Sequence, residues 1–193
     1  DWLENWVEDK KDIIKTPGTE SNVKEIYDAC NKLKEDPSND IINQFSEYYN
    51  YAIHRAVTGP SLEKSFLEVK KDLKLKPRFY VSASGSSGTL AAGDYLKDSL
   101  GTLTAVVEAQ ECPTLLKNGY GEHNIQGIGD KHVPLIHNVM NTDFVVDISD
   151  KATDNLNLVF NTKIGKDYLI KKLGLQNSIV NKFPEFGFSS IAN

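Results

Sequence analysis

The stretch Tyr80-Val-Ser-Ala-Ser-Gly-Ser-Ser-Gly-Thr-Leu-Ala-Ala-Gly-Asp-Tyr-Leu-Lys97 decides how this sequence folds. A run of β-branched and aromatic residues enters a loop of glycine and serine, and the loop opens directly into an amphipathic segment. This order predicts a strand at 78–83, a tight turn and a helix at 88–99. The apolar run at 103–108 predicts a second strand. Two strands joined by a crossover helix must be parallel.

The glycine- and serine-rich turn has the composition of an anion site. It offers unpaired backbone N–H groups, small hydroxyls and the positive end of a helix dipole, which together hold phosphate groups. The small hydroxyls of the turn are those of Ser84, Ser86, Ser87 and Thr89. The turn is neither a P-loop, because no Lys-Ser or Lys-Thr pair follows the second glycine, nor a complete dinucleotide fingerprint. From these residues alone, a glycine turn at a helix N-cap without any ligand is the alternative.

The rest of the chain continues the alternation of helices and strands. Apolar periodicity and breakers predict helices at 21–35, 48–57, 60–74 and 151–161, a further helix ending at Leu173, and strands at 40–45 and 144–148. Cys30 falls on the apolar face of the first helix, which predicts a small core residue. The near-continuous apolar strands favour a sheet that is covered on both sides. The sequence therefore predicts an α/β fold of three layers, a mainly parallel sheet with helices on both faces.

The segment 109–143 has little periodicity, and a loop of that length in a compact domain is usually functional. Its three histidines and Cys112 match no zinc-ligand spacing, so we predict no metal site. His54 lies on a predicted helix, where a solvated or hydrogen-bonded side chain is expected. A Gly-x-Ser-x-Gly nucleophile pattern is absent from the sequence, which argues against a serine hydrolase.

Composition narrows the class of protein and its partners. The net charge of −5 over 193 residues, with no run of five Lys or Arg, argues against a nucleic-acid partner. No apolar run approaches the ~18 residues that a membrane span needs, so we expect no membrane partner. Two cysteines are too few for a disulfide framework, and we expect a cytoplasmic protein.

Five short motifs carry a resemblance to a known family. They are Asn43-Gln44-Phe45-Ser46, Thr58-Gly59-Pro60, the eight residues 82–89, His123-Asn-Ile-Gln-Gly-Ile-Gly129 and Gly187-Phe-Ser-Ser190. In this order, and with similar spacings, they resemble motifs of the pyridoxal-phosphate enzymes of the cysteine synthase and tryptophan synthase β-subunit type, known as fold type II. Residues 123–129 differ from the family's His-Lys-Ile-Gln-Gly-Ile-Gly at one position. Ser87 stands where the family has glycine.

The resemblance implies roles for particular residues. It implies that Gly85, Ser86, Ser87, Gly88 and Thr89 wrap the phosphate of pyridoxal 5'-phosphate. It implies that Gly127 and Gly129 pass their backbone beside the cofactor ring and the substrate. It also implies that Gln44 contacts the substrate carboxylate. Since none of the lysines matches the position of the family's Schiff-base lysine, no catalytic residue is assigned to this chain.

The resemblance also implies an organisation and an activity. Residues 1–50 would be the remainder of a smaller N-terminal lobe, and residues 51–193 a larger phosphate-binding lobe that is truncated at its C-terminus. The chain resembles an internal piece of a lyase-like enzyme that performs β-elimination or β-replacement on a serine- or cysteine-type amino acid, with a homodimer expected. The alternative is a non-catalytic module of the same fold that binds a phosphate or a partner surface.

Overall fold

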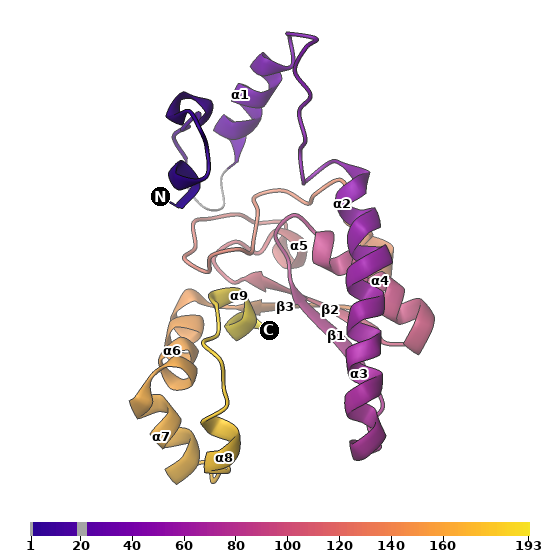
Figure 1. The fold of residues 1–193 in the computed structure, drawn as a ribbon, viewed down its shortest axis with the longest axis vertical. Helices are drawn as coiled ribbons and strands as arrows, with labels where there is room; N and C mark the ends of the chain where they lie inside the picture. The colour runs from indigo at the N-terminus through magenta and orange to yellow at the C-terminus, as the bar shows by residue number, and fades with distance from the viewer. Residues whose placement is uncertain (1, 19–22) are drawn as a thin grey trace.

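A computed structural model describes residues 2–18 and 23–193 of the chain, and helices and strands alternate along most of that length (Figure 1). The helices are α1 (Lys24–Leu33), α2 (Tyr48–Ile53), α3 (Gly59–Leu73), α4 (Gly88–Leu100), α5 (Thr114–Lys117), α6 (Asp150–Asn161), α7 (Lys163–Lys171), α8 (Asn177–Val180) and α9 (Phe188–Ala192). Short 3₁₀ turns are η1 (Trp2–Asn5), η2 (Lys10–Asp12) and η4 (Val139–Asn141), and η3 (His54–Thr58) is a π-helical turn. The strands are β1 (Phe79–Ala83), β2 (Leu103–Ala109) and β3 (Phe144–Ile148).

The three described strands form one parallel sheet in the order β1-β2-β3. Val81 pairs with Ala105, and Ala105 pairs with Phe144 on the other side, so the register places these three side chains on one face. The βαβ unit predicted from the sequence is therefore confirmed, with α4 as its crossover helix. Gly101, at φ +68°, ends α4 in the left-handed conformation and lets the chain turn into β2.

Helices cover the two faces of this sheet. On one face, α4 approaches closely enough that a Cβ on Gly93 would meet Oγ1 of Thr104 at 3.2 Å. Side chains alternate along a strand, so Val107 points to the opposite face, where it packs with Ile128 and with Ala192 of α9. Figure 1 shows α6 to α9 gathered on that second side. The predicted arrangement of helices on both sheet faces is thus observed.

Residues 40–45 are not the strand that the sequence predicted. Residues 41–43 have no regular secondary structure and no strand partner, and residues 44–46 form a turn. The Asn43 side chain accepts a hydrogen bond from the backbone N–H of Phe45 (2.9 Å), and the Asn43 carbonyl accepts one from Ser46 (3.1 Å). Asparagine favours such turns because its side chain competes with a strand partner for the backbone. The prediction was wrong because this segment pairs with no strand of the sheet, and Ile42 is exposed.

The predicted helices are confirmed, with shifted ends. The 48–57 segment continues through the π-turn η3, and the first helix spans Lys24–Leu33, with residues 21 and 22 of its predicted range outside the described residues. Cys30 is half-buried rather than a core residue. The segment 109–143 is mostly irregular, as expected, apart from α5 and η4. Within the described residues, no helix combines the length and the apolar character that crossing a membrane requires.

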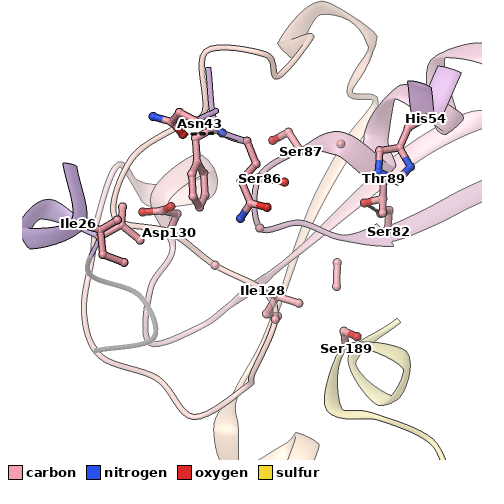
Figure 2. Close-up of a pocket in the computed structure, with 18 of the residues that line it drawn as sticks. Ile26, Asn43, His54, Ser82, Ser86, Ser87, Thr89, Ile128, Asp130 and Ser189 are labelled. Atoms are coloured by element: carbon pink, nitrogen blue, oxygen red, sulfur yellow. Dashed lines mark hydrogen bonds between the residues drawn. The ribbon is translucent and has the colours of Figure 1, made fainter. Parts of the chain in front are cut away.

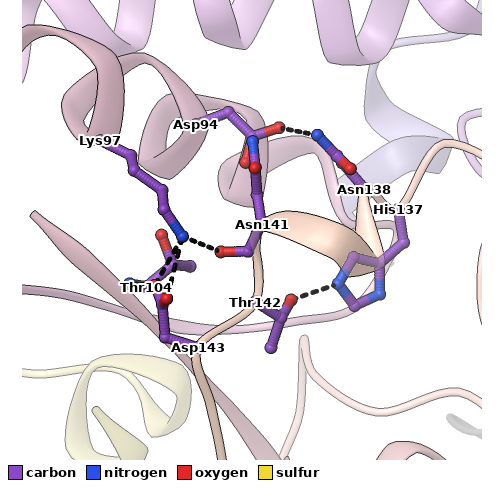
Figure 3. A network of polar contacts seen from close by, with 8 residues as sticks. All are labelled: Asp94, Lys97, Thr104, His137, Asn138, Asn141, Thr142 and Asp143. Carbon is purple, nitrogen blue, oxygen red and sulfur yellow. Dashed lines mark hydrogen bonds and ion pairs between the residues drawn. The ribbon is translucent and has the colours of Figure 1, made fainter.

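A polar network fastens the end of segment 109–143 to α4 (Figure 3). The buried carboxylate of Asp94 accepts hydrogen bonds from the Tyr51 hydroxyl (2.7 Å) and from Nδ2 of Asn138 (3.1 Å). Lys97 bonds the Asn141 carbonyl (3.1 Å) and both carboxylate oxygens of Asp143 (2.9 Å each). The long loop is therefore fixed at its C-terminal end before it enters β3.

Candidate functional site

A cavity of about 730 Å³ opens at the carboxyl end of β1, where ligands bind in parallel sheets. It is lined by all eight residues that the sequence singled out for binding, namely Gln44, Gly85, Ser86, Ser87, Gly88, Thr89, Gly127 and Gly129. Figure 2 shows Ser82, Thr89 and His54 on one side of it and Asp130 with Asn43 on the other. The structure therefore brings together residues that are up to 85 positions apart in the chain, counted from Gln44 to Gly129 (129 − 44).

One wall is the anion loop, by which we mean residues 85–89, which follow β1 and include the first two residues of α4. Its backbone leads into the first turn of a 13-residue helix, where N–H groups have no helical partners. The Ser82 and Thr89 hydroxyls lie 2.8 Å apart, and Tyr80 donates a hydrogen bond to the Thr89 carbonyl (2.9 Å). Strand β1 thus holds the end of the loop in place through side chains of alternate residues.

Ser87 takes a conformation that normally belongs to glycine. Its backbone has φ +68° and ψ 5°, in the left-handed region, and it is the residue before α4. Its side chain is almost fully buried and its hydroxyl lies 3.2 Å from that of Ser84. A residue with a Cβ is disfavoured in this region by about 1–2 kcal/mol. The family glycine at this position therefore has a conformational reason, and Ser87 meets the same backbone requirement with a side chain.

Two glycines of the anion loop are required by close approach. A Cβ on Gly85 would meet the Gly127 carbonyl oxygen at 3.2 Å, so the loop lies directly against the segment that carries Gly127. A Cβ on Gly88 would collide with the Asn50 side chain and would lie 2.8 Å from Cδ2 of His54. Gly88 is therefore the point where the loop touches α2 and η3.

Asn50 is a residue that the sequence reasoning missed. Its Nδ2 donates to the Gln44 carbonyl (2.8 Å) and lies 3.1 Å from the Ser86 hydroxyl, so one side chain ties the Gln44 turn to the anion loop. His54 was expected to be a solvated or hydrogen-bonded helix histidine; it is hydrogen-bonded, and it also lines the cavity. Its Nδ1 lies 2.9 Å from the Thr58 hydroxyl, within the π-turn η3, and π-turns are frequent at functional sites.

The opposite wall is the backbone around Gly127 and Gly129. Both glycines have positive φ, +85° and +74°, which favours glycine over other residues. The Gly129 N–H donates to the Ser84 carbonyl (2.7 Å), which joins this wall to the anion loop. A Cβ on Gly129 would collide with the buried ring of His123, so the backbone at Gly129 packs directly against that histidine.

At the other end of the cavity, three side chains form a line. Asp130 Oδ1 lies 3.0 Å from Nδ1 of His132, and Nε2 of His132 lies 3.2 Å from the Tyr27 hydroxyl. Burial raises the pKa of the Asp130 carboxyl, against a smaller lowering by His132 and by neighbouring backbone N–H groups. Burial, followed by the Asp130 charge, also raises the pKa of Tyr27. No local sequence pattern indicates this cluster, because Tyr27 is over a hundred residues from its partners.

The lining fits a phosphorylated, flat ligand. Unpaired N–H groups and hydroxyls at the anion loop are donors for a phosphate, and the glycines leave room for a ring close to the backbone. Among the described residues that line the cavity none is a lysine, so a covalent attachment to pyridoxal phosphate would come from outside them. The described residues contain no group of three or more His, Cys, Asp or Glu placed to hold a metal ion.

The sequence of this chain is similar to that of a known enzyme. Cysteine synthase B of Campylobacter jejuni is 32% identical over 136 residues, which are 69% of this chain and 43% of that protein. No family model matches the sequence. The chain spans about half the length of the relatives it matches.

Solved structures share the fold. The O-acetylserine-dependent cystathionine β-synthase from Helicobacter pylori superposes with a TM-score of 0.64 at 24% identity, over 93% of this chain and 51% of that one. A hydrogen sulfide-producing enzyme from Fusobacterium nucleatum also gives 0.64 at 24% identity, over 88% of this chain and 45% of that one. Sequence identity with a cysteine synthase, the shared fold and the ordered motifs agree, and the chain belongs to the cysteine synthase family of fold type II pyridoxal-phosphate enzymes.

Proposed function

We propose that the complete protein is a pyridoxal-phosphate enzyme that performs β-elimination or β-replacement on a serine- or cysteine-type amino acid. In it, this chain supplies the loop that holds the cofactor phosphate. The observation that carries the proposal is the convergence of the eight family-matched residues on one cavity at the N-terminus of α4. Neither the anion loop nor the segment with Gly127 and Gly129 would support a cofactor site alone, since each is also compatible with a plain turn.

The proposed roles follow from what each wall offers. The anion loop binds the phosphate through N–H groups and the hydroxyls of Ser86, Ser87 and Thr89. Gly127 and Gly129 leave space beside the ring, and Gln44 orients the substrate carboxylate. Pyridoxal phosphate, when bound, supplies the electron sink for chemistry at the amino-acid α-carbon. The residues of this chain bind the phosphate, orient the substrate and limit the access of water.

Further parts of the proposal concern organisation. We propose that residues 1–50 belong to a smaller lobe and residues 51–193 to the larger one, in a cytoplasmic homodimer. On the sheet face that α9 covers, the side chains near the amino ends of the strands are exposed; they include Phe79, Val81 and Phe144. These apolar side chains are available for contacts with a second subunit. Light scattering coupled to size exclusion would test the dimer. A monomer across the concentration range would refute it.

Absorbance of the complete protein tests the proposed function. An internal imine absorbs at about 420 nm, and borohydride reduction removes the band and fixes the cofactor to a lysine. We expect the band, its loss on reduction, and a change on adding L-serine or an activated derivative of it. A protein that binds pyridoxal phosphate without the band, or binds inorganic phosphate only, would instead support the alternative of a non-catalytic phosphate-binding module.

A further inference from the structure

The second end of the cavity has a chemistry that the anion loop does not explain. We propose that Tyr27, His132 and Asp130 form a proton relay, through which the Tyr27 hydroxyl exchanges a proton with the β-substituent of the amino-acid substrate. The inference rests on the proposed function, since it assigns a group to the leaving or entering atom of that reaction. It narrows the substrate class to amino acids whose β-substituent needs a proton in order to leave, such as a hydroxyl.

The geometry of the relay is a carboxylate, an imidazole and a phenol in sequence. Asp130 Oδ1 lies 3.0 Å from His132 Nδ1, and His132 Nε2 lies 3.2 Å from the Tyr27 hydroxyl oxygen. With Nδ1–H directed at the carboxylate, Nε2 of the neutral ring accepts a hydrogen bond from the phenol. When the ring is protonated, Nε2–H donates to the phenol oxygen instead, and the phenol proton is free to turn toward the cavity.

The burial of the Asp130 carboxylate also points to a functional role. Its side chain is 4% exposed, and Oδ1 makes no hydrogen bond of good geometry, although His132 is at ion-pair distance. A buried carboxylate oxygen without a hydrogen bond is costly, and such atoms concentrate at functional sites. The neighbouring cation does not neutralise it, because Lys131 pairs with Glu122. The charge that Asp130 can stabilise is therefore that of His132.

Both end groups of the relay reach the cavity, and the middle one is open to solvent. Tyr27 and Asp130 line the cavity, whereas His132 does not and keeps 40% of its side chain exposed. The Phe45 ring fixes their orientation, with centroids 6.1 Å from Tyr27 and 5.8 Å from His132. Figure 2 shows Asp130 across Ser86 from Thr89, so the relay faces the part of a ligand that lies away from the phosphate. His132 can exchange its proton with solvent while Tyr27 contacts the reactant.

The direction of the Tyr27 pKa shift keeps the phenol in its protonated form. Burial raises the pKa of the Tyr27 phenol, and the Asp130 charge raises it further, so the phenol keeps its proton at neutral pH. The titratable and charged groups near the relay are Cys30, on the same helix as Tyr27, together with Lys131 and Glu122. Proton transfer from a positioned phenol is an established form of general acid catalysis.

The proton balance closes in both directions. In elimination, the bond from Cβ to its substituent breaks with both electrons on the substituent, Tyr27 gives it a proton, and the substituent leaves as a neutral molecule. The His132 imidazolium then returns a proton to the phenolate and becomes neutral. In replacement, the incoming thiol or alcohol gives its proton to Tyr27 as its sulfur or oxygen bonds to Cβ, and Tyr27 passes a proton to His132. Asp130 acts as a positioning residue that stabilises the imidazolium.

The test compares two substrates that differ in their need for a proton. L-serine must lose a hydroxyl as water, whereas β-chloro-L-alanine loses chloride without protonation. In the complete protein, Tyr27→Phe should lower kcat for L-serine by about 100-fold or more, and kcat for β-chloro-L-alanine by less than about threefold. His132→Gln should show the same selective loss. Tyr49→Phe, at an exposed tyrosine outside the cavity lining, is the matched control and should change neither.

A second readout needs neither cofactor nor turnover. Because His132 lowers the pKa of Asp130, the ¹³C carboxyl titration of Asp130 should move to higher pH in His132→Gln. Equal losses with both substrates, no loss with L-serine, or an unmoved Asp130 titration would each overturn the relay. A wild-type protein without the cofactor band would overturn the proposed function and this role of the relay with it, whereas a wild type with the band and equal losses would overturn the relay alone.

Discussion

The two ends of the cavity are built in different ways. The anion-loop end consists of contiguous residues 85–89, whose backbone is shaped by one strand, one turn and one helix. The Asp130 end consists of side chains from α1 and from the irregular segment 109–143, which meet only in the folded protein. The first is set by local backbone preferences, and the second by long-range packing. A single sequence can therefore indicate the anion-loop end, but not the Asp130 end.

The largest expected effect is at the anion-loop end. Gly88→Asp should weaken pyridoxal phosphate binding by at least about 100-fold, since the new Cβ would push against Asn50 and His54, and the added carboxylate would repel the phosphate. Cofactor titration followed by absorbance measures this. Gly187→Ala is the matched control, because a Cβ there has no neighbour within 4 Å. Equal affinities for Gly88→Asp and wild type would show that the loop does not hold the phosphate.

The next effect concerns the side chain that couples the loop to the Gln44 turn. Asn50→Ala removes the hydrogen bond to the Gln44 carbonyl and the contact with Ser86, and should weaken cofactor binding about tenfold, because a typical hydrogen bond contributes about 1 kcal/mol. Asn39→Ala, at an exposed asparagine whose amide also bonds a backbone carbonyl, is the control. If both variants bind alike, the coupling through Asn50 has no part in binding.

The same difference explains how far prediction from sequence reached. Strands at 78–83 and 103–108 and the anion loop could be predicted, because apolar runs, glycine and small hydroxyls encode them locally. The 40–45 segment could not, since the choice between strand and turn depended on whether a partner strand was beside it. Asn50 and Tyr27 could not be assigned either, because their roles depend on contacts with residues far along the chain.

The pH dependence of stability should differ in sign between Asp130, whose carboxyl is buried, and Asp143, whose carboxylate pairs with Lys97. The pKa of Asp130 is raised in the folded protein, so its contribution to stability is full below about pH 4 and falls as pH rises through the folded pKa. Relative to wild type, Asp130→Asn should therefore gain in Tm between about pH 3 and about pH 7.

Asp143 gives the opposite sign within the same experiment. The ion pair with Lys97 lowers the pKa of Asp143, so its contribution to stability is present at neutral pH and is lost as pH falls through that lowered value. Asp143→Asn should consequently lose Tm relative to wild type as pH rises from about 3 to about 7. Thermal scans between about pH 3 and about pH 7 measure the Tm of both variants relative to wild type. If the two Tm differences changed in the same direction with pH, the opposite pKa shifts of Asp130 and Asp143 would be contradicted.

The smallest effect tests the backbone of the anion loop. Ser87→Gly relieves the left-handed strain but gives up the contact with Ser84, so its stability should stay within about 1 kcal/mol of wild type. Ser87→Ala keeps the strain and loses the same contact, and should be less stable than Ser87→Gly by about 1 kcal/mol. Urea unfolding compares the pair. An alanine variant more stable than the glycine variant would show that the positive φ is not maintained.

Amide chemical shifts upon addition of pyridoxal phosphate test the central claim most directly. In the complete protein, we expect the largest ¹⁵N–¹H shifts on residues 85–89, with smaller ones at Gly127 and Gly129 and none on α7, which is outside the cavity lining. Inorganic phosphate should shift residues 85–89 and leave Gly127 unmoved. Shifts concentrated elsewhere, or an anion loop that pyridoxal phosphate leaves unchanged, would show that residues 85–89 do not hold the cofactor phosphate.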